Sequence, residues 1–270
     1  MYQKFILFIF LVTFNFIIWP TESNLSKSFV QLSPAQIKTL GNKIWHNECA
    51  GSYNGLTSWH KNETFASLGI GHFIWYSKAQ ESGFSQTFPD LIIYLKNNSV
   101  LLPGWLALNV NQECPWKNRT EFYQEFSSKK MVELRDMLAS TIDLQTQFII
   151  ERAHQALPNL LAHAPAQKKS HIKKQFTRLM ATPQGAYALI DYLNFKGEGI
   201  NTKERYNGKG WGLLQALLDM KEIQTISAPH EFATVTKQLL TNRVAHAPSD
   251  KEKQFLPGWL NRINTYTQPI

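Results

Sequence analysis

The chain has 270 residues, of which 43% are hydrophobic and 13% aromatic, and its formal net charge is +8. This length is enough for one large domain or two small ones, and the hydrophobic fraction can supply a packed core. The positive charge favours polyanionic partners such as an acidic cell wall, acidic membranes or nucleic acid. Because the basic residues form no long run and no base-reading helix is evident, the sequence argues against a nucleic-acid-binding module.

The first 23 residues have the pattern of a signal peptide. Lys4 precedes an apolar stretch at 5–19, and small polar residues follow it. The stretch is shorter than the ~20 residues that a spanning helix needs. We therefore expect a secreted or periplasmic protein with its folded domain at 24–270. An uncleaved anchor is the alternative, and it is the only contact with a membrane that the sequence predicts.

The chain contains two cysteines, Cys49 and Cys114. In an oxidising compartment they could form one disulfide, and the sequence does not tell whether they meet. Two cysteines do not complete a structural zinc site, and the 8 histidines are scattered without a metal-ligand spacing. We expect no metal and no other cofactor.

The first predicted helix spans 33–48 and begins at Ser33, a residue type favoured at the N-cap. Its apolar residues fall on one helical stripe, formed by Ile37, Leu40, Ile44 and Trp45. Glu48 lies on the same stripe, at the end of the helix.

A carboxyl group in the position of Glu48 is predicted to retain its proton more readily than usual. The carboxyl end of a helix carries partial negative charge, and burial beside Trp45 penalises the ionised form. A protonated carboxyl is what a glycosidase needs in order to protonate a leaving oxygen. The alternative is an exposed terminal glutamate without a role.

The rest of the chain predicts a small β lobe followed by helices. Residues 50–64 are polar and turn-rich, and 65–76 have the pattern of strands bent at glycines. Helices are predicted at about 87–97, 120–155, 166–181, 183–194, 210–222, 229–244 and 251–265. Prolines stand near the predicted breaks: Pro103, Pro158, Pro183, Pro229, Pro248 and Pro257. No linker separates two domains, so we expect one α+β domain with a small β lobe and a larger, mainly helical lobe.

The stretch Ser67-Leu-Gly-Ile-Gly-His72, placed downstream of a helix that ends in Glu48, resembles the phage-type lysozymes of glycoside hydrolase family 24. The resemblance covers about residues 33–76. It continues more thinly at 192–199, at 210–215 and in Gly258-Trp-Leu-Asn-Arg262, and it does not extend to the middle of the chain.

The resemblance implies a lysozyme-like fold and an exported muramidase that cuts the β-1,4 bonds of peptidoglycan by inversion. It makes Glu48 the general acid and Ser67 the residue that helps to place the attacking water. The family's second carboxylate, an aspartate, would align with Lys61, which lacks the chemistry. We expect Glu63, the nearest carboxylate, to take that role.

Further residues receive expected roles from the same pattern. His72 is expected to hold the β lobe together, and Gly69 and Gly71 to permit a bend or a close approach of the backbone. Contacts with the sugar are expected from four side chains: Trp75, Asn194, Trp211 and Gln215.

Other functions remain open at this stage. Close variants are a chitosanase, a chitinase or a lytic transglycosylase. A different class is a non-catalytic glycan-binding protein. This alternative stays open because Lys61 stands where the family has its aspartate, and the nearest carboxylate is Glu63. An exported effector is a third. The sequence does not indicate the biological role or the oligomeric state.

Overall fold

Helix α1 (Pro34–Cys49) begins at a complete capping box. The Ser33 hydroxyl accepts from the Gln36 amide, and the Gln36 side chain accepts from the Ser33 amide. The helix ends where Ala50 adopts a left-handed conformation with φ of 51°. Leu40 and Ile44 are fully buried. The predicted helix and its core-facing stripe are therefore confirmed.

The computed structural model describes residues 29–77, 85–109, 113–221 and 225–270. It contains a three-stranded antiparallel sheet in the order β1 (Thr57–Ser58), β2 (Ala66–Leu68), β3 (Phe73–Trp75). The helices that follow are α2 (Phe88–Asn97), α3 (Gly104–Ala107), α4 (Arg119–Gln124), α5 (Lys129–Ser140), α6 (Ile142–His163), α7 (Lys169–Met180), α8 (Pro183–Lys196), α9 (Leu213–Asp219), α10 (Ala228–His246) and α11 (Leu256–Asn264). Short 3₁₀ helices lie at Asn54–Leu56, Ala166–Lys168, Thr202–Glu204, Asp250–Phe255 and Thr265–Thr267. The predicted α+β class is confirmed.

The turn between β2 and β3 is shaped by its glycines. Gly69 has φ of +70°, which strains any residue with a side chain, and a Cβ there would lie 2.4 Å from the amide oxygen of Gln145. That oxygen accepts from the Ile70 amide at 3.0 Å. Gly71 is also crowded, by Phe73 and Ile149. Helix α6 thus fixes the turn by close approach, in keeping with the expected role of both glycines.

Two expectations about the helices are wrong. The single helix expected at 120–155 is three helices, because Ser128 caps α5 and the chain turns again at Thr141. Pro158 lies inside α6 and does not break it. Leu157 and Leu160 are buried on either side of this proline, so core packing continues through the position.

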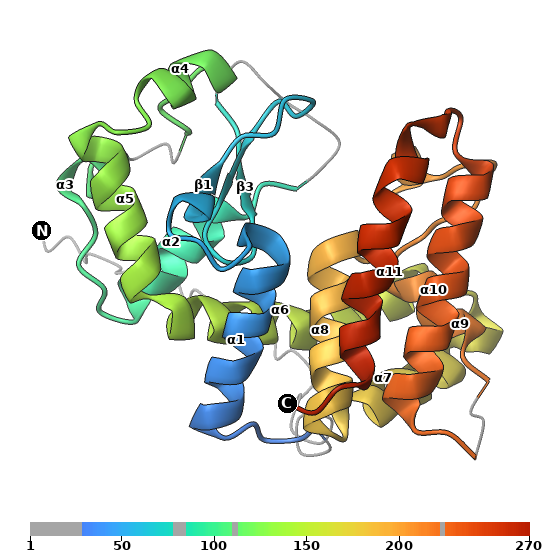
Figure 1. Ribbon diagram of the computed structural model, residues 1–270. Helices are drawn as coiled ribbons and strands as arrows, with labels where there is room; N and C mark the ends of the chain where they lie inside the picture. Colours follow the sequence, from blue (N-terminus) through green and yellow to red (C-terminus); the bar gives the residue numbers. More distant parts are fainter. Residues whose placement is uncertain (1–28, 78–84, 110–112, 222–224) are drawn as a thin grey trace, which may run out of the picture.

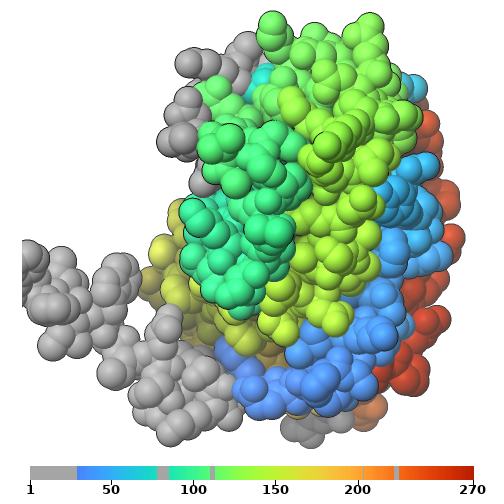
Figure 2. All heavy atoms as spheres, turned by 90° about the vertical axis from the view of Figure 1, so that its left-hand side faces the viewer, coloured from blue at the N-terminus to red at the C-terminus, as the bar shows by residue number. Residues whose placement is uncertain are grey.

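The elements form two groups joined by α6. The sheet and α2 to α5 lie on one side, α7 to α11 lie on the other, and α6 runs beneath both (Figure 1). Helix α1 stands between the groups and packs on α6 and α8. In the space-filling view, its blue residues lie between the green segments and the red C-terminal helices (Figure 2). The carboxyl end of α1 therefore points to the region between the sheet and α11.

The predicted signal peptide at 1–23 lies outside the described residues. None of the helices in the described ranges is both long enough and apolar enough to cross a bilayer.

Candidate functional site

Glu48 is held at the end of α1 by two donors from the helical group. Arg262 of α11 donates to its Oε1 at 2.7 Å, and Asn194 of α8 donates to the same oxygen at 3.1 Å. The Glu48 side chain is 14% exposed. Both donors converge on Oε1, so Oε2 makes neither of these hydrogen bonds.

The Arg262 guanidinium is shared with a second, fully buried carboxylate. It donates to Asp191 Oδ2 at 2.8 Å and to Oδ1 at 2.9 Å. Asp191 also accepts from Tyr266 at 2.6 Å and from Asn47 at 3.1 Å. Burial lowers the pKa of Arg262, but the charges of Asp191 and Glu48 outweigh it and raise that pKa well above its usual value. Asp191 thus neutralises much of the charge that Arg262 presents to Glu48.

His72 lies between the two acidic positions that the sequence singled out. Its Nδ1 is 3.5 Å from Glu48 Oε2, and its charge also acts on Glu63. The residue has φ of 49°, in the left-handed region that non-glycine residues rarely adopt. Its neighbour Gly71 accepts a hydrogen bond from Asn194 at 3.3 Å. The turn that carries His72 is therefore tied to the helical group at the same place as Glu48.

Glu63 and Ser67 meet on the β side of the site. The Ser67 hydroxyl donates to the Glu63 carboxylate, which lowers the pKa of Glu63, as do His60 and His72. Desolvation is the largest influence, and it raises the pKa of Glu63 above 4.5 overall. The side chains of Glu63 and Ser67 therefore lie within interaction distance of each other.

The loop that carries Glu63 is fixed by the backbone. The buried indole of Trp59 donates to the Glu63 carbonyl at 2.9 Å, and the Glu63 amide donates to the His60 carbonyl at 3.1 Å. Arg119 of α4 donates to the Trp59 carbonyl at 2.9 Å. Glu63 is therefore held by an ordered loop.

The structure brings together five of the residues singled out from sequence: Glu48, Glu63, Ser67, His72 and Asn194. Asn194, for which a sugar contact was expected, donates to Glu48. Lys61 is exposed.

Three expected sugar contacts are not supported by their placement. Trp75 is 1% exposed and packs against Phe88 and two further tryptophans, so its ring is core. Trp211 is 3% exposed. Gln215 accepts from the Gly212 amide at 3.1 Å and donates to the Gly199 carbonyl at 3.0 Å, so its amide holds the backbone. A buried tryptophan or glutamine is the same residue type as one that binds a ligand at the surface. The sequence alone therefore does not distinguish the two, and the burial seen in the structure does.

The two cysteines are both buried and free. Burial raises the pKa of the Cys49 thiol and that of the Cys114 thiol to about 12. The disulfide that an oxidising compartment would allow is not formed in this structure.

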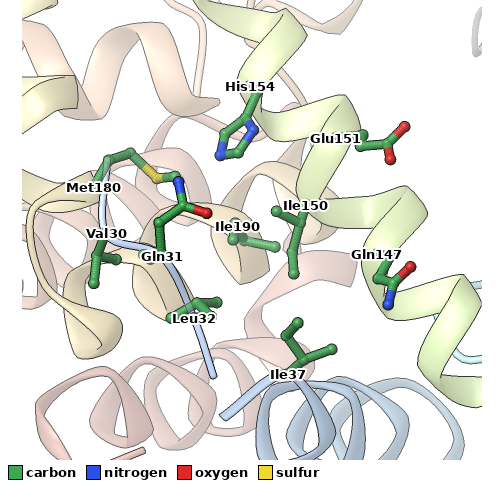
Figure 3. A pocket seen from close by; sticks show the side chains of 11 residues that line it. Val30, Gln31, Leu32, Ile37, Gln147, Ile150, Glu151, His154, Met180 and Ile190 are labelled. Carbon is green, nitrogen blue, oxygen red and sulfur yellow. The ribbon is translucent and has the colours of Figure 1, made fainter. Parts of the chain in front are cut away.

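A hollow lies at the opposite end of α1 from Glu48. It has a volume of about 230 Å³ and is lined by residues of 30–32, α1, α6, α7 and α8 (Figure 3). Ile37 lines it, and eleven residues of helix at about 1.5 Å each separate Ile37 from Glu48. Glu151 is the one carboxylate among the described lining residues. The hollow therefore lacks the pair of acids that acid–base hydrolysis requires.

Two functional residues were missed by sequence reasoning. The sequence predicted no role for Arg262 or for Asp191. Both contacts join residues far apart in the chain, and no spacing rule connects them.

Among the described residues, no group of three or more histidine, cysteine, aspartate or glutamate side chains could hold a metal ion. Comparisons with models of protein families, with curated proteins and with solved structures give no match for this chain.

Proposed function

We propose that this chain is a lysozyme-like glycoside hydrolase that cuts β-1,4 bonds of peptidoglycan. The observation that carries the proposal is the position of His72, which contacts Glu48 and acts electrostatically on Glu63. It indicates that a semi-buried carboxyl from α1 and a second carboxyl from the β lobe serve one site. Most glycosidases use a pair of carboxyl groups that flank the scissile bond.

Glu48 acts as the general acid in this proposal. Arg262 and Asn194 both donate to Oε1, so Oε2, on the side of His72, is the oxygen assigned to the leaving group.

Glu63 acts as the general base. It takes a proton from water while the water oxygen attacks the anomeric carbon, and the departing glycosidic oxygen receives the proton of Glu48. Ser67, which donates to Glu63, orients the same water. Water attack opposite the leaving group inverts the anomeric configuration and requires about 6.5–9.5 Å between the two carboxyl groups.

The test compares the wild-type chain with Glu48→Gln, Glu63→Gln and Glu133→Gln on purified peptidoglycan. Glu133 is a carboxylate of α5 whose partner is the exposed Lys129, so it serves as a matched control. We expect soluble fragments with free reducing ends from the wild type and from Glu133→Gln, and none from the other two. Binding without release by all four proteins would indicate a glycan-binding protein, and anhydro ends would indicate a lytic transglycosylase.

A further inference from the structure

Two leucines on either side of the short helix α3 point away from the core. Leu101 is 94% exposed and Leu108 is 80% exposed, although leucine is a residue type that is usually buried. Between them, Gly104 and Ala107 are exposed as well, and a Cβ added at Gly104 would meet no atom within 4 Å. These four residues form an apolar surface on the outer side of α3, which we call the α3 patch.

The α3 patch is compact and belongs to a long uncharged stretch of the chain. Between Asp90 and Glu113 the sequence has a single charged residue, Lys96. The Leu108 amide donates to the Gly104 carbonyl at 3.1 Å, which closes one helical turn. The Cα atoms of the two leucines therefore lie within about 16 Å of each other. Contiguous apolar surface of this kind marks a contact with another molecule.

The patch is presented by ordered residues beneath it. Leu106 is buried, and its amide donates to the Pro103 carbonyl at 2.9 Å. The half-buried ring of Trp105 lies 6.4 Å from the Trp75 ring and 6.1 Å from the Trp116 ring, measured between ring centres. Helix α3 lies at the outer edge of the sheet-bearing group (Figure 1), on the side that Figure 2 turns toward the viewer. The two leucines are therefore carried outward on a fixed support.

Lysines border the α3 patch. The Lys130 ammonium lies 5.4 Å from the centre of the Trp105 ring. The Val100 amide donates to the Leu95 carbonyl at 3.0 Å, and this turn brings the exposed Lys96 to the start of the uncharged stretch. Within the described residues, neither of these two lysines forms an ion pair with a carboxylate. The border of the patch is therefore positively charged.

The size and the charge of the α3 patch fit a lipid surface better than a protein partner. A stable protein interface uses about 20–30 residues from each side, far more than this patch supplies. Exposed leucines bordered by lysines suit an anionic bilayer, because apolar side chains enter the acyl boundary and the cations attract the headgroups. The formal net charge of +8 draws the whole chain toward such a surface.

We propose that the α3 patch docks on the surface of an anionic lipid bilayer. Leu101 and Leu108 enter the boundary between headgroups and acyl chains, and Lys96 and Lys130 lie at the headgroups. This contact is distinct from insertion of the apolar stretch at 5–19, and it does not depend on the proposed hydrolysis.

The experiment places a polarity-sensitive fluorophore at single surface cysteines of the full chain. Because Cys49 and Cys114 are buried, with thiol pKa values raised to about 12, an added surface cysteine is labelled selectively. The labelled variants are Leu101→Cys, Leu108→Cys and, as a control on the exposed side of α7, Ser170→Cys. The vesicles contain either equal parts of phosphatidylglycerol and phosphatidylcholine or phosphatidylcholine alone.

We expect the anionic vesicles to shift the emission to the blue at both leucine positions and to leave it unchanged at Ser170→Cys. The stretch at 5–19 is common to all variants, so binding through it produces no difference between the labelled positions. In labelled Leu108→Cys, Leu101→Gln should reduce the shift and Leu101→Met should retain it. Both replacements are at a side chain that is almost fully exposed, so neither endangers the fold.

The role of the lysines is tested in the same labelled chain. Replacement of Lys96 and Lys130 by glutamine should weaken binding to the anionic vesicles by about fivefold for each lysine. The matched control replaces two exposed lysines elsewhere, Lys38 of α1 and Lys173 of α7, and should weaken it less.

Four results would overturn the proposal. They are an unchanged emission at both leucine positions, an equal shift at Ser170→Cys, an equal response to phosphatidylcholine alone, and equal weakening by the two pairs of lysine substitutions. A shift that needs no vesicles and grows with protein concentration would also overturn it, since a second copy of the chain would then cover the patch.

Discussion

Arg262 lies between two carboxylates, and this arrangement determines how the site is held. It pairs with fully buried Asp191 through two hydrogen bonds and with Glu48 through a third. An arginine in this position does two things at once: it compensates a buried charge and it orients the proposed acid. Removal of one partner from a buried ion pair leaves the other charge uncompensated, which costs more than the pair itself contributes.

Arg262→Met is therefore expected to lower the free energy of unfolding by about 3–5 kcal/mol, because Asp191 loses its cation in a fully buried position. Urea denaturation at neutral pH measures the change. The double variant Arg262→Met with Asp191→Asn should recover part of the loss. A decrease within about 0.5 kcal/mol in the single variant would contradict the role given to this pair.

Glu63→Gln is expected to lower the hydrolysis rate by about 10²–10⁴-fold, the contribution of a general base. It should also stabilise the fold at neutral pH. Since the pKa of Glu63 is raised on folding, its ionised form costs stability as the pH rises from 4.5 through the folded-state pKa.

The stability difference between Glu63→Gln and wild type, followed by thermal melts, should therefore shrink to zero below pH 4.5. A wild type that is more stable than Glu63→Gln at neutral pH would contradict the desolvation of Glu63.

The site could be predicted from sequence only in part. Glu48 was predicted from its place at the end of an amphipathic helix, and Ser67 from the resemblance of the stretch at 67–72 to the phage-type lysozymes. Asn194 and Arg262 reach Glu48 from distant helices, and such contacts depend on tertiary packing. Trp75 was expected at the sugar because aromatic rings suit both a core and a ligand.

At the scale of elements, the contact between α1 and α6 positions Glu48. Gly41 of α1 faces Thr146 of α6 so closely that an added Cβ would lie 2.2 Å from the Thr146 hydroxyl oxygen. Thr146 is fully buried and its hydroxyl is bonded within α6. The two helices therefore approach at a point where only glycine fits.

Gly41→Ala is expected to destabilise the protein by about 1–3 kcal/mol through overpacking, although alanine favours helices. Chemical denaturation measures the effect. Thr146→Ala in the same chain removes the clashing atoms and should restore part of the stability. If Gly41→Ala alone were stabilising, the close approach of α1 and α6 would be wrong.

Helix positions were predicted well where caps and prolines mark them. Ser33 begins α1, and Pro183 stands at the start of α8. The prediction of one helix at 120–155 was wrong because no glycine or proline marks the breaks at Ser128 and Thr141. Pro158 was expected to stand near a helix break, but α6 continues through it because the residues on either side pack in the core.

For the whole molecule, the site lies where the β group and the helical group meet. Asn194 bonds both Glu48 and the Gly71 carbonyl, so it ties the β turn to the helices. Sequence patterns predict the β group and the helical group separately. They do not predict how the two groups meet, because that contact joins residues far apart in the chain.

The two buried cysteines report on the integrity of this packing. Because burial raises the pKa of both thiols to about 12, we expect neither Cys49 nor Cys114 to react with iodoacetamide in the native protein. Both should react in urea, as measured by mass spectrometry. Labelling of the native chain, or a disulfide that resists labelling in urea, would contradict the structure.

The central claim is that Glu48 and Glu63 hydrolyse a glycosidic bond together, as acid and base. Proton NMR of the reducing ends, recorded within the first minutes of peptidoglycan digestion, tests it most directly. We expect the α anomer to appear first from the β-linked substrate, and we expect Glu48→Gln and Glu63→Gln to release no detectable reducing ends in that time. Initial release of the β anomer, or unchanged release by either variant, would contradict it.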